Sequence, residues 1–205
     1  PVVLNVQNVD GTWVKWRPQN YDGSTGGLTT LREGLRKSMN LISVRMVQQG
    51  IAPAEQVKRT AKRMGITTEI RAVDALALGT SEVIPLEMVS AYAAYANKGV
   101  YSKPFAITRI EDRYGNILKD YFPDREEVLN EETAYLMTSL LQTVMDRGTG
   151  GSARWKYKFN RPAAGKTGTT QGWSDAWFVG FTPQIAAGAW FGVDDFRVPL
   201  GPGQD

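Results

Sequence analysis

The sequence contains no cysteine and no histidine among its 205 residues. A thiol nucleophile, a disulfide, a zinc site built from Cys and His, and an imidazole general base are therefore all excluded. Acid–base chemistry near neutral pH would have to use Lys, Tyr, Asp or Glu with a shifted pKa. The sequence also lacks a signal peptide and any apolar run near membrane-spanning length. We expect neither a metal nor an organic cofactor.

The remaining composition is that of a folded protein, with 42% hydrophobic and 10% aromatic residues. The length suits one large domain or two small ones. The net charge is +3, and the positive residues form clusters such as Lys58-Arg59 and Lys62-Arg63. Because clusters of this kind on helices usually form a solvated face, we do not expect a nucleic-acid partner.

Hydrophobic spacing and turn residues predict a mixture of helices and strands. The predicted helices are 30–37 with a Thr30/Glu33 capping box, 41–49, Pro53 to Gly65, Pro85 to Gly99, and Asn130 to Gly148. The predicted strands lie within 1–16 around a turn at Asp10-Gly11, in a hairpin of Phe105–Ile110 with Ile117–Phe122, and at Asp175–Thr182 and Ile185–Val193. Residues 148–152 are expected to form a loop. Leu31, Leu35, Leu86, Leu136 and Leu140 are expected on buried helix faces.

Ser38 and Asn40 are two residues apart, which on a continuous helix would separate them by roughly 200°. If both side chains face one pocket, the helix must break between 30–37 and 41–49. Either residue could then cap the second helix. Taken alone, a Ser-x-Asn tripeptide is common and carries little information.

The run Lys166-Thr167-Gly168-Thr169 opens the pair of strand-like segments near the end of the chain. On a sheet edge, lysine brings charge, threonine brings hydroxyls, and glycine leaves room for close approach, so the run suits an anionic ligand. A nucleotide-binding loop is the competing interpretation. It would need glycine where Asn160 stands and an apolar helix afterwards, and the sequence has neither.

Four blocks together resemble the transpeptidase domain of penicillin-binding proteins, most closely of the bifunctional class A kind. They are Arg17-Pro-Gln-Asn-Tyr-Asp-Gly23, Leu31 to Asn40, Leu78 to Val83 with Pro85 to Met88, and Gly165 to Thr170 with Ser174 to Gly180. The resemblance spans nearly the whole chain. It implies an α+β fold in which helices flank an antiparallel sheet, as in serine β-lactamases, with residues 1–205 forming a partial domain that is incomplete at both ends.

The resemblance also implies a function: acyl transfer on the D-Ala-D-Ala end of peptidoglycan stem peptides, with β-lactam antibiotics binding at the same place. Carried over onto this chain, the catalytic elements are Ser38, Asn40 and Lys166, and the substrate-binding residues are Thr167, Gly168 and Thr169. Such an enzyme is expected on the extracytoplasmic face of the cell membrane, anchored by a segment outside this chain.

One element of the family signature is missing. The family's nucleophile is the serine of Ser-x-x-Lys, and no serine here has lysine three residues later. Thr12 and Lys15 have this spacing, but their neighbours alternate like a strand. The resemblance therefore places the nucleophile upstream in the same polypeptide, together with a glycosyltransferase domain, and predicts that this chain alone is inactive. The family's final helix is expected beyond Asp205.

Two alternatives stay open. A catalytically inactive homologue could bind wall peptide or antibiotic as a sensor, and only the upstream sequence would distinguish it. An unrelated nucleotide-binding domain is the other.

Separately, Glu126 to Asn130 fits a Glu-x-x-Leu-Asn pattern that positions a deacylating water in class A β-lactamases. Its place before a long helix favours a structural role with Asn130 as a cap.

Overall fold

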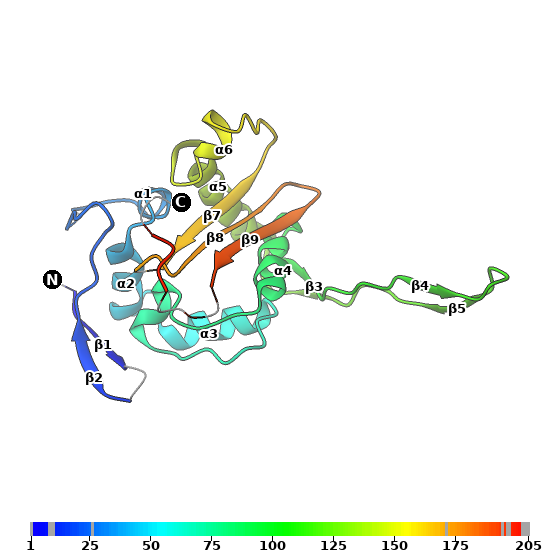
Figure 1. Cartoon of the computed structure of the whole chain (residues 1–205), viewed down its shortest axis with the longest axis horizontal. Coiled ribbons are helices and arrows are strands. Elements are labelled where there is room, and N and C mark those ends of the chain that lie inside the picture. The colour runs from blue at the N-terminus through cyan, green and yellow to red at the C-terminus, as the bar shows by residue number, and fades with distance from the viewer. Residues whose placement is uncertain are drawn as a thin grey trace.

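The computed structural model describes residues 2–7, 11–25, 27–170, 172–193, 195 and 198–201. Its centre is an antiparallel sheet with strand order β7-β8-β9, formed by Ala164–Thr169, Asp175–Phe181 and Ala186–Gly192 (Figure 1). Lys166 lies opposite Val179 and Gly168 lies opposite Trp177. Within the described residues β7 pairs with β8 alone, so its other edge has no strand partner.

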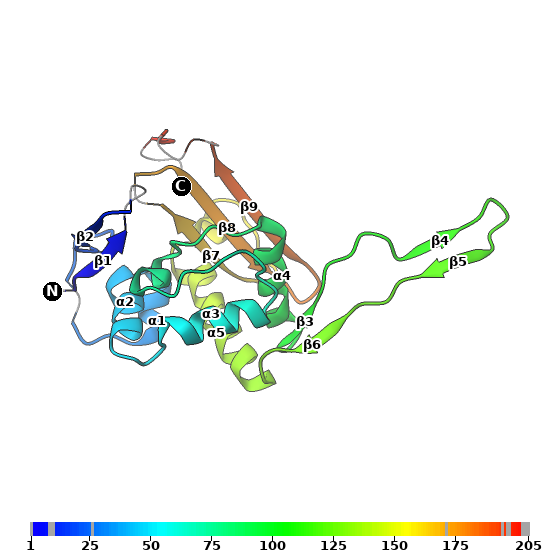
Figure 2. The same ribbon diagram turned by 90° about the horizontal axis from the view of Figure 1, so that it is seen from below.

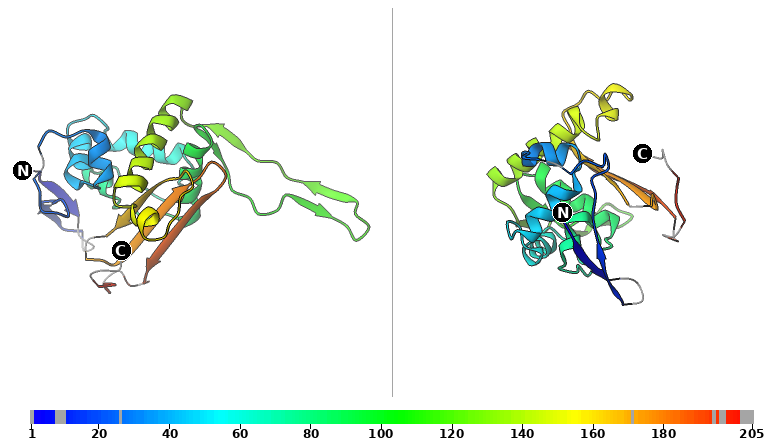
Figure 3. Two further views of the ribbon diagram at one scale, coloured as in Figure 1. Left: turned by 90° about the horizontal axis from the view of Figure 1, so that it is seen from above. Right: turned by 90° about the vertical axis from the view of Figure 1, so that its left-hand side faces the viewer.

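Two helices cover one face of this sheet: α4, Pro85–Ala96, and α5, Glu131–Arg147 (Figure 3). α5 contacts β7, and α4 contacts β8 and β9. The core between them contains Leu141 at 0% exposure, packed with Ala164 and Phe181. Because Ala164 begins β7, the core directly fixes the strand that carries Lys166.

The remaining helices lie beside this layer. They are α1, Leu31–Arg36; α2, Asn40–Gln48; α3, Ala54–Arg63; the 3₁₀ helix η1, Asp74–Leu78; and the short α6, Ser152–Trp155. The guanidinium of Arg32 in α1 donates to the Ser139 carbonyl at 2.7 Å and to the Thr143 hydroxyl at 2.8 Å, both in α5. Helix α5 therefore positions both α1 and β7.

The N-terminal strands β1, Leu4–Gln7, and β2, Trp13–Trp16, pair antiparallel as predicted. Asp10 of the expected turn lies outside the described residues. The buried side of this pair carries Leu4, which packs with Val44 of α2 and Ala75 of η1. The pair thus packs against α2, the helix that begins at Asn40.

A long β-ribbon projects away from the body of the molecule (Figure 2). At its base β3, Val100–Ser102, pairs with β6, Arg125–Glu127, and further out β4, Arg109–Glu111, pairs with β5, Ile117–Asp120. The predicted hairpin is confirmed, with shorter strands than expected. Among the described helices, none is both long and apolar enough to cross a membrane.

Three burial predictions were wrong. Leu31, Leu86 and Leu136 are 55%, 60% and 60% exposed. In α5 the buried stripe instead runs through Ala134, Leu141 and Val144, which leaves Leu136 about 200° away from Ala134 around the helix. The contacts of each helix with its neighbours, which spacing alone does not supply, decide which apolar stripe is buried. The long helices themselves begin and end close to the predicted positions.

Leu141→Ala tests the core. Deleting a fully buried leucine side chain should lower the free energy of unfolding by about 2–5 kcal/mol, because the cavity cannot refill completely. Urea denaturation followed by circular dichroism measures the loss. The matched control is Leu118→Ala on the ribbon, where the side chain is 65% exposed; its effect should stay within about 0.5 kcal/mol. Equal losses in the two variants would contradict this description of the core.

Candidate active site

The helix break predicted at Ser38 is present. α1 ends at Arg36 and α2 begins at Asn40, and Ser38 between them has a φ of +53°, in the left-handed region that non-glycine residues rarely adopt. The Met39 amide donates to the Gly34 carbonyl at 2.8 Å and so closes the turn. Met39 occupies the cap position of α2 without a side-chain bond, so neither Ser38 nor Asn40 is the cap.

The structure brings Ser38 and Lys166 together although they are 128 residues apart. The Lys166 ammonium donates to the Ser38 hydroxyl oxygen at 2.7 Å and to the carbonyl of Thr167 at 2.7 Å. The half-buried Lys166 side chain thus bridges the turn and strand β7. The resemblance implies that Ser38 and Lys166 belong to one site, and the structure places their side chains in contact.

Asn40 lies beside Ser38 and ties a neighbouring loop to the start of α2. Its amide nitrogen donates to the Gln19 carbonyl at 2.8 Å. Next to it, Asn20 is only 4% exposed, donates to the Ser24 carbonyl at 2.9 Å and accepts from the Leu41 amide at 3.1 Å. No local pattern in the sequence gives Asn20 an individual role, although Asn residues in turns commonly bond the backbone of their own loop.

Thr167, Gly168 and Thr169 form the outer part of β7. A Cβ on Gly168 would meet only the Trp177 Cβ, at an ordinary 3.4 Å. Packing within the sheet therefore does not itself demand glycine there, in contrast to Gly165, where a Cβ would lie 2.9 Å from the Val179 carbonyl oxygen.

Thr149 makes a contact with Thr167 that no pattern in the sequence predicts. Its hydroxyl lies 2.7 Å from the hydroxyl of Thr167, so the loop after α5 reaches the outer face of β7. Residues 148–152 are the predicted loop, whose last residue, Ser152, begins α6. Nothing in the spacing of the sequence places Thr149 beside Thr167, because that contact depends on how α5 packs against β7.

Burial also changes the chemistry of the lysine. It lowers the pKa of Lys166 to about 8 from its ordinary value of 10.5, because the charged form loses hydration. A lysine with a pKa near neutrality can both give and take a proton, which an ordinary lysine does poorly at pH 7. The site therefore has a candidate acid–base group although the chain lacks histidine.

Residues 5–193 match the family model described as penicillin binding protein transpeptidase domain. The chain belongs to this family. Penicillin-binding protein 1A of Aquifex aeolicus is 40% identical over 179 residues, covering 87% of this chain and 24% of that protein. The chain thus spans about a quarter of the length of this curated relative.

Solved structures of the family agree with the fold. Penicillin-binding protein 1A from Haemophilus influenzae has a TM-score of 0.85 and 27% identity, covering 99% of this chain and 35% of that chain. The PonA1 protein from Mycobacterium tuberculosis, solved in complex with penicillin V, has a TM-score of 0.73 and 26% identity, and the match covers 96% of this chain and 55% of that chain. The predicted family and the α+β fold are confirmed.

The competing interpretations of single motifs do not fit. Lys166 lies in strand β7 instead of in a loop that begins a helix, so it does not form a nucleotide-binding loop. Lys15 lies in strand β2, as predicted. Asn130 caps α5 by accepting from the Thr133 amide at 2.9 Å, and Glu126 pairs with Tyr101 at the base of the ribbon. The structural interpretation of Glu126 to Asn130 is confirmed.

The lowered pKa of Lys166 predicts a pH-dependent stability. Below about pH 8 the lysine is protonated in both the folded and unfolded states, and the penalty for burying the charge is fully present. Between about pH 8 and 10.5 the unfolded state binds more protons, so the free energy of unfolding should rise with pH through this window.

Lys166→Met should remove this rise. Urea denaturation of the wild type and of Lys166→Met between pH 7 and 10 measures the difference in their free energies of unfolding. The contributions of all other titrating groups cancel in this difference. Titration of the lysine side-chain carbon by NMR, assigned through its absence in Lys166→Met, should give a midpoint near 8. Parallel stability curves, or a midpoint near 10.5, would show that Lys166 is not buried as described.

Proposed function

We propose that this chain is part of a peptidoglycan DD-transpeptidase, in which Ser38, Asn40 and Lys166 support acyl transfer on D-Ala-D-Ala stem peptides. The observation that carries the proposal is the 2.7 Å bond from the Lys166 ammonium to the Ser38 hydroxyl. The bond joins a hydroxyl to an ammonium of lowered pKa, and both lie beside the unpaired edge of β7. Such a pair can transfer a proton to a substrate whose carboxylate is bound along that edge.

The acylating serine and its lysine base belong to a segment outside this chain. Two observations support this part of the proposal: no serine here is followed by lysine at the third position, and the chain spans about a quarter of its curated relative. The same polypeptide would also supply a glycosyltransferase domain and the membrane anchor, and would place the enzyme on the extracytoplasmic side of the membrane.

In the acylation step the external serine gives its hydroxyl proton to the external lysine base, its oxygen attacks the carbonyl of the penultimate D-alanine, and the carbon–nitrogen bond to the last D-alanine breaks. The leaving nitrogen takes a proton from the Ser38 hydroxyl, which Lys166 replenishes. With a pKa of about 8, Lys166 is largely protonated at pH 7 and gives up its proton at little cost. In the second step a neutral amine of a neighbouring stem peptide attacks the ester carbon and gives one proton through Ser38 to Lys166, while the ester bond breaks and the serine oxygen takes back the proton held by the external lysine.

Strand β7 would hold the substrate. The Thr170 amide donates back to Asp175 at the start of β8, and amides alternate sides along a strand. The Thr169 amide therefore faces the open edge, where it can form one half of an oxyanion hole. The hydroxyls of Thr167 and Thr169 and the charge of Lys166 would bind the terminal carboxylate, each charge-assisted contact contributing about 1.5–3 kcal/mol.

β-Lactams would bind through the same contacts, because their carboxylate and strained amide mimic the substrate. Deacylation should be slow. Glu126, which fits the pattern of a water-positioning glutamate, lies in β6 at the base of the ribbon. The inactive-sensor alternative shares every residue of this site and differs only in the upstream segment; no observation favours it.

The first test compares two forms of the protein. The full-length protein should form a covalent adduct with a fluorescent penicillin, visible on a denaturing gel, and the isolated chain of residues 1–205 should form none. An unlabelled full-length protein would contradict the transpeptidase proposal. A labelled isolated chain would instead show that the nucleophile lies within these residues.

The second test is Lys166→Ala in the full-length protein. The acylation rate constant for penicillin should fall by about 10²–10³, the usual loss when one preorganised stabilising group is removed. The melting temperature should change little, because the substitution also removes a buried charge. Lys103→Ala, on the exposed ribbon, is the control. A large loss of melting temperature would make Lys166 structural, and an unchanged acylation rate would exclude it from catalysis.

A further inference from the structure

Residues 155–161 form an exposed loop between α6 and β7 in which aromatic and basic residues alternate, and we call it the basic loop. Every residue of the loop is exposed, and the side chains of Trp155 and Tyr157 are 68% and 69% exposed. The basic residues are Lys156, Lys158 and Arg161. Large aromatic side chains at this exposure, set among cations, are typical of a surface that binds a partner.

Positive charge is concentrated around the basic loop. Residues 147–174 contain six of the chain's 24 basic residues and no Asp or Glu, which leaves 18 basic and 21 acidic residues elsewhere. Among the residues that the structure describes, no carboxylate forms an ion pair with Lys156, Lys158 or Arg161. The three charges are therefore available to an anionic partner.

The backbone of the basic loop is held in place by Arg154 of α6. The Arg154 guanidinium donates to the carbonyls of Phe159 and Arg161 at 2.6 Å each, and it pairs with the Asp146 carboxylate of α5 at 2.9 Å. Lys158 has a φ of +55°, in the left-handed region, so the chain turns sharply there. These bonds preorganise the loop, and a partner would not have to order it on binding.

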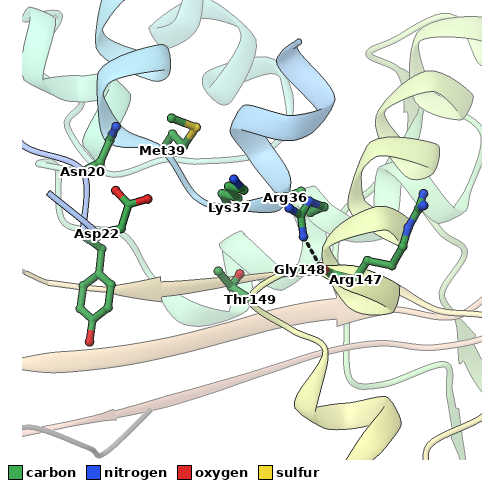
Figure 4. Close-up of a pocket in the computed structure, with 9 residues that line it drawn as sticks. Asn20, Asp22, Arg36, Lys37, Met39, Arg147, Gly148 and Thr149 are labelled. Atoms are coloured by element: carbon green, nitrogen blue, oxygen red, sulfur yellow. Dashed lines mark hydrogen bonds between the residues drawn. The ribbon is translucent and has the colours of Figure 1, made fainter. Parts of the chain in front are cut away.

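The basic loop belongs to the segment that borders the proposed reaction site. This segment begins after α5 beside a cavity of about 310 Å³, where the Arg36 guanidinium donates to the Arg147 carbonyl and the Thr149 amide donates to the Arg36 carbonyl at 3.2 Å (Figure 4). The Thr149 hydroxyl lies 2.7 Å from that of Thr167, and the segment ends where β7 begins at Ala164. α6 and the chain after it lie on the side of β7 opposite β8 (Figure 1 and Figure 3). A polymer that enters along the unpaired edge of β7 would therefore pass the basic loop.

We propose that the basic loop binds the glycan strand that carries the donor stem peptide, outside the D-Ala-D-Ala end that reacts. The three cations pair with carboxylates of the stem peptides along the strand, and Trp155 and Tyr157 pack their flat faces against its sugar rings. The inference rests on the proposed transpeptidase function and makes its substrate a polymer instead of a free peptide. Because these contacts are the same before and during acylation, they lower KM without changing kcat.

An anionic membrane surface is the competing partner, because lysines interleaved with Trp and Tyr also suit a bilayer interface. A flat bilayer on the basic loop would lie across the unpaired edge of β7, where the donor peptide is proposed to bind. A strand that continues from the donor peptide can contact the loop and the edge together. The position of the loop therefore favours the glycan strand.

The test uses the full-length protein in nanodiscs of neutral phospholipid, with uncross-linked glycan strands bearing pentapeptides as the donor. The release of D-alanine from the strands gives KM and kcat. The acylation rate constant for penicillin is measured in parallel. Penicillin carries neither the sugar rings nor the remainder of the stem peptide, so its rate constant reports on the reaction site alone.

The charge-removed variant combines Lys156→Gln, Lys158→Gln and Arg161→Gln. Its KM for the strands should rise by roughly tenfold, the combined loss of three exposed charge contacts. Its kcat and its rate constant for penicillin should stay at the wild-type values. Added salt should raise the KM of the wild type more than that of this variant, because salt screens exposed charges. Lys156→Arg combined with Lys158→Arg keeps the charge and should keep the wild-type KM.

Trp155→Ala should raise the KM for the strands by roughly fivefold, because an exposed aromatic face is lost. Its control is Trp13→Ala, which removes a tryptophan side chain that is 60% exposed on β2. The control for the charge-removed variant combines Arg59→Gln, Lys103→Gln and Lys119→Gln, three exposed charges on α3 and the ribbon. Both controls should keep the wild-type KM.

Wild-type KM values in both the charge-removed variant and Trp155→Ala would overturn the proposed glycan contact and leave the transpeptidase proposal intact. A rise in KM no larger than that of the matched controls would do the same. If the rise occurs only in nanodiscs of anionic phospholipid, the basic loop faces the membrane and the glycan contact is also overturned. Failure of the wild-type protein to form a penicillin adduct would instead overturn the proposed function itself.

Discussion

The contact between the Lys166 ammonium and the Ser38 hydroxyl is the interaction on which the site depends. The contact joins the turn at Ser38, which has a left-handed backbone conformation, to the edge strand β7. Neither the turn nor the strand by itself holds the two side chains together. Helix α5 does so, because Arg32 of α1 is bonded to its Ser139 and Thr143 while Leu141 packs beneath β7. A shift of α5 would therefore separate the Ser38 hydroxyl from the Lys166 ammonium.

The same packing sets the chemistry. Burial lowers the pKa of Lys166 to about 8, which places its proton exchange close to neutral pH in a chain without histidine. Burial of the ammonium costs stability, as the lowered pKa records, and its two acceptors, the Ser38 hydroxyl and the Thr167 carbonyl, offset part of that cost. The cost of burying the charge thus gives Lys166 a pKa suited to acid–base chemistry near neutral pH.

Much of this arrangement is encoded locally and could be predicted from the sequence. The helix break at Ser38 follows from helix geometry if Ser38 and Asn40 face one pocket, and the strands after Lys166 follow from their apolar runs. Other features depend on tertiary partners that no local pattern contains: the burial of Asn20, the approach of Thr149 to Thr167, and the exposure of Leu136. The nucleophile is not predicted within this chain, and the family resemblance alone indicates where it belongs.

A double-mutant cycle on the acylation rate of the full-length protein tests the central contact most directly. Ser38→Ala, Lys166→Ala and the double variant would be compared with the wild type by rapid-quench kinetics with penicillin. If the two groups pass one proton as a unit, the double variant should be about as slow as the slower single variant. If the fold losses in the acylation rate of the two single variants simply multiply in the double variant, Ser38 and Lys166 act independently and their contact does not contribute to catalysis.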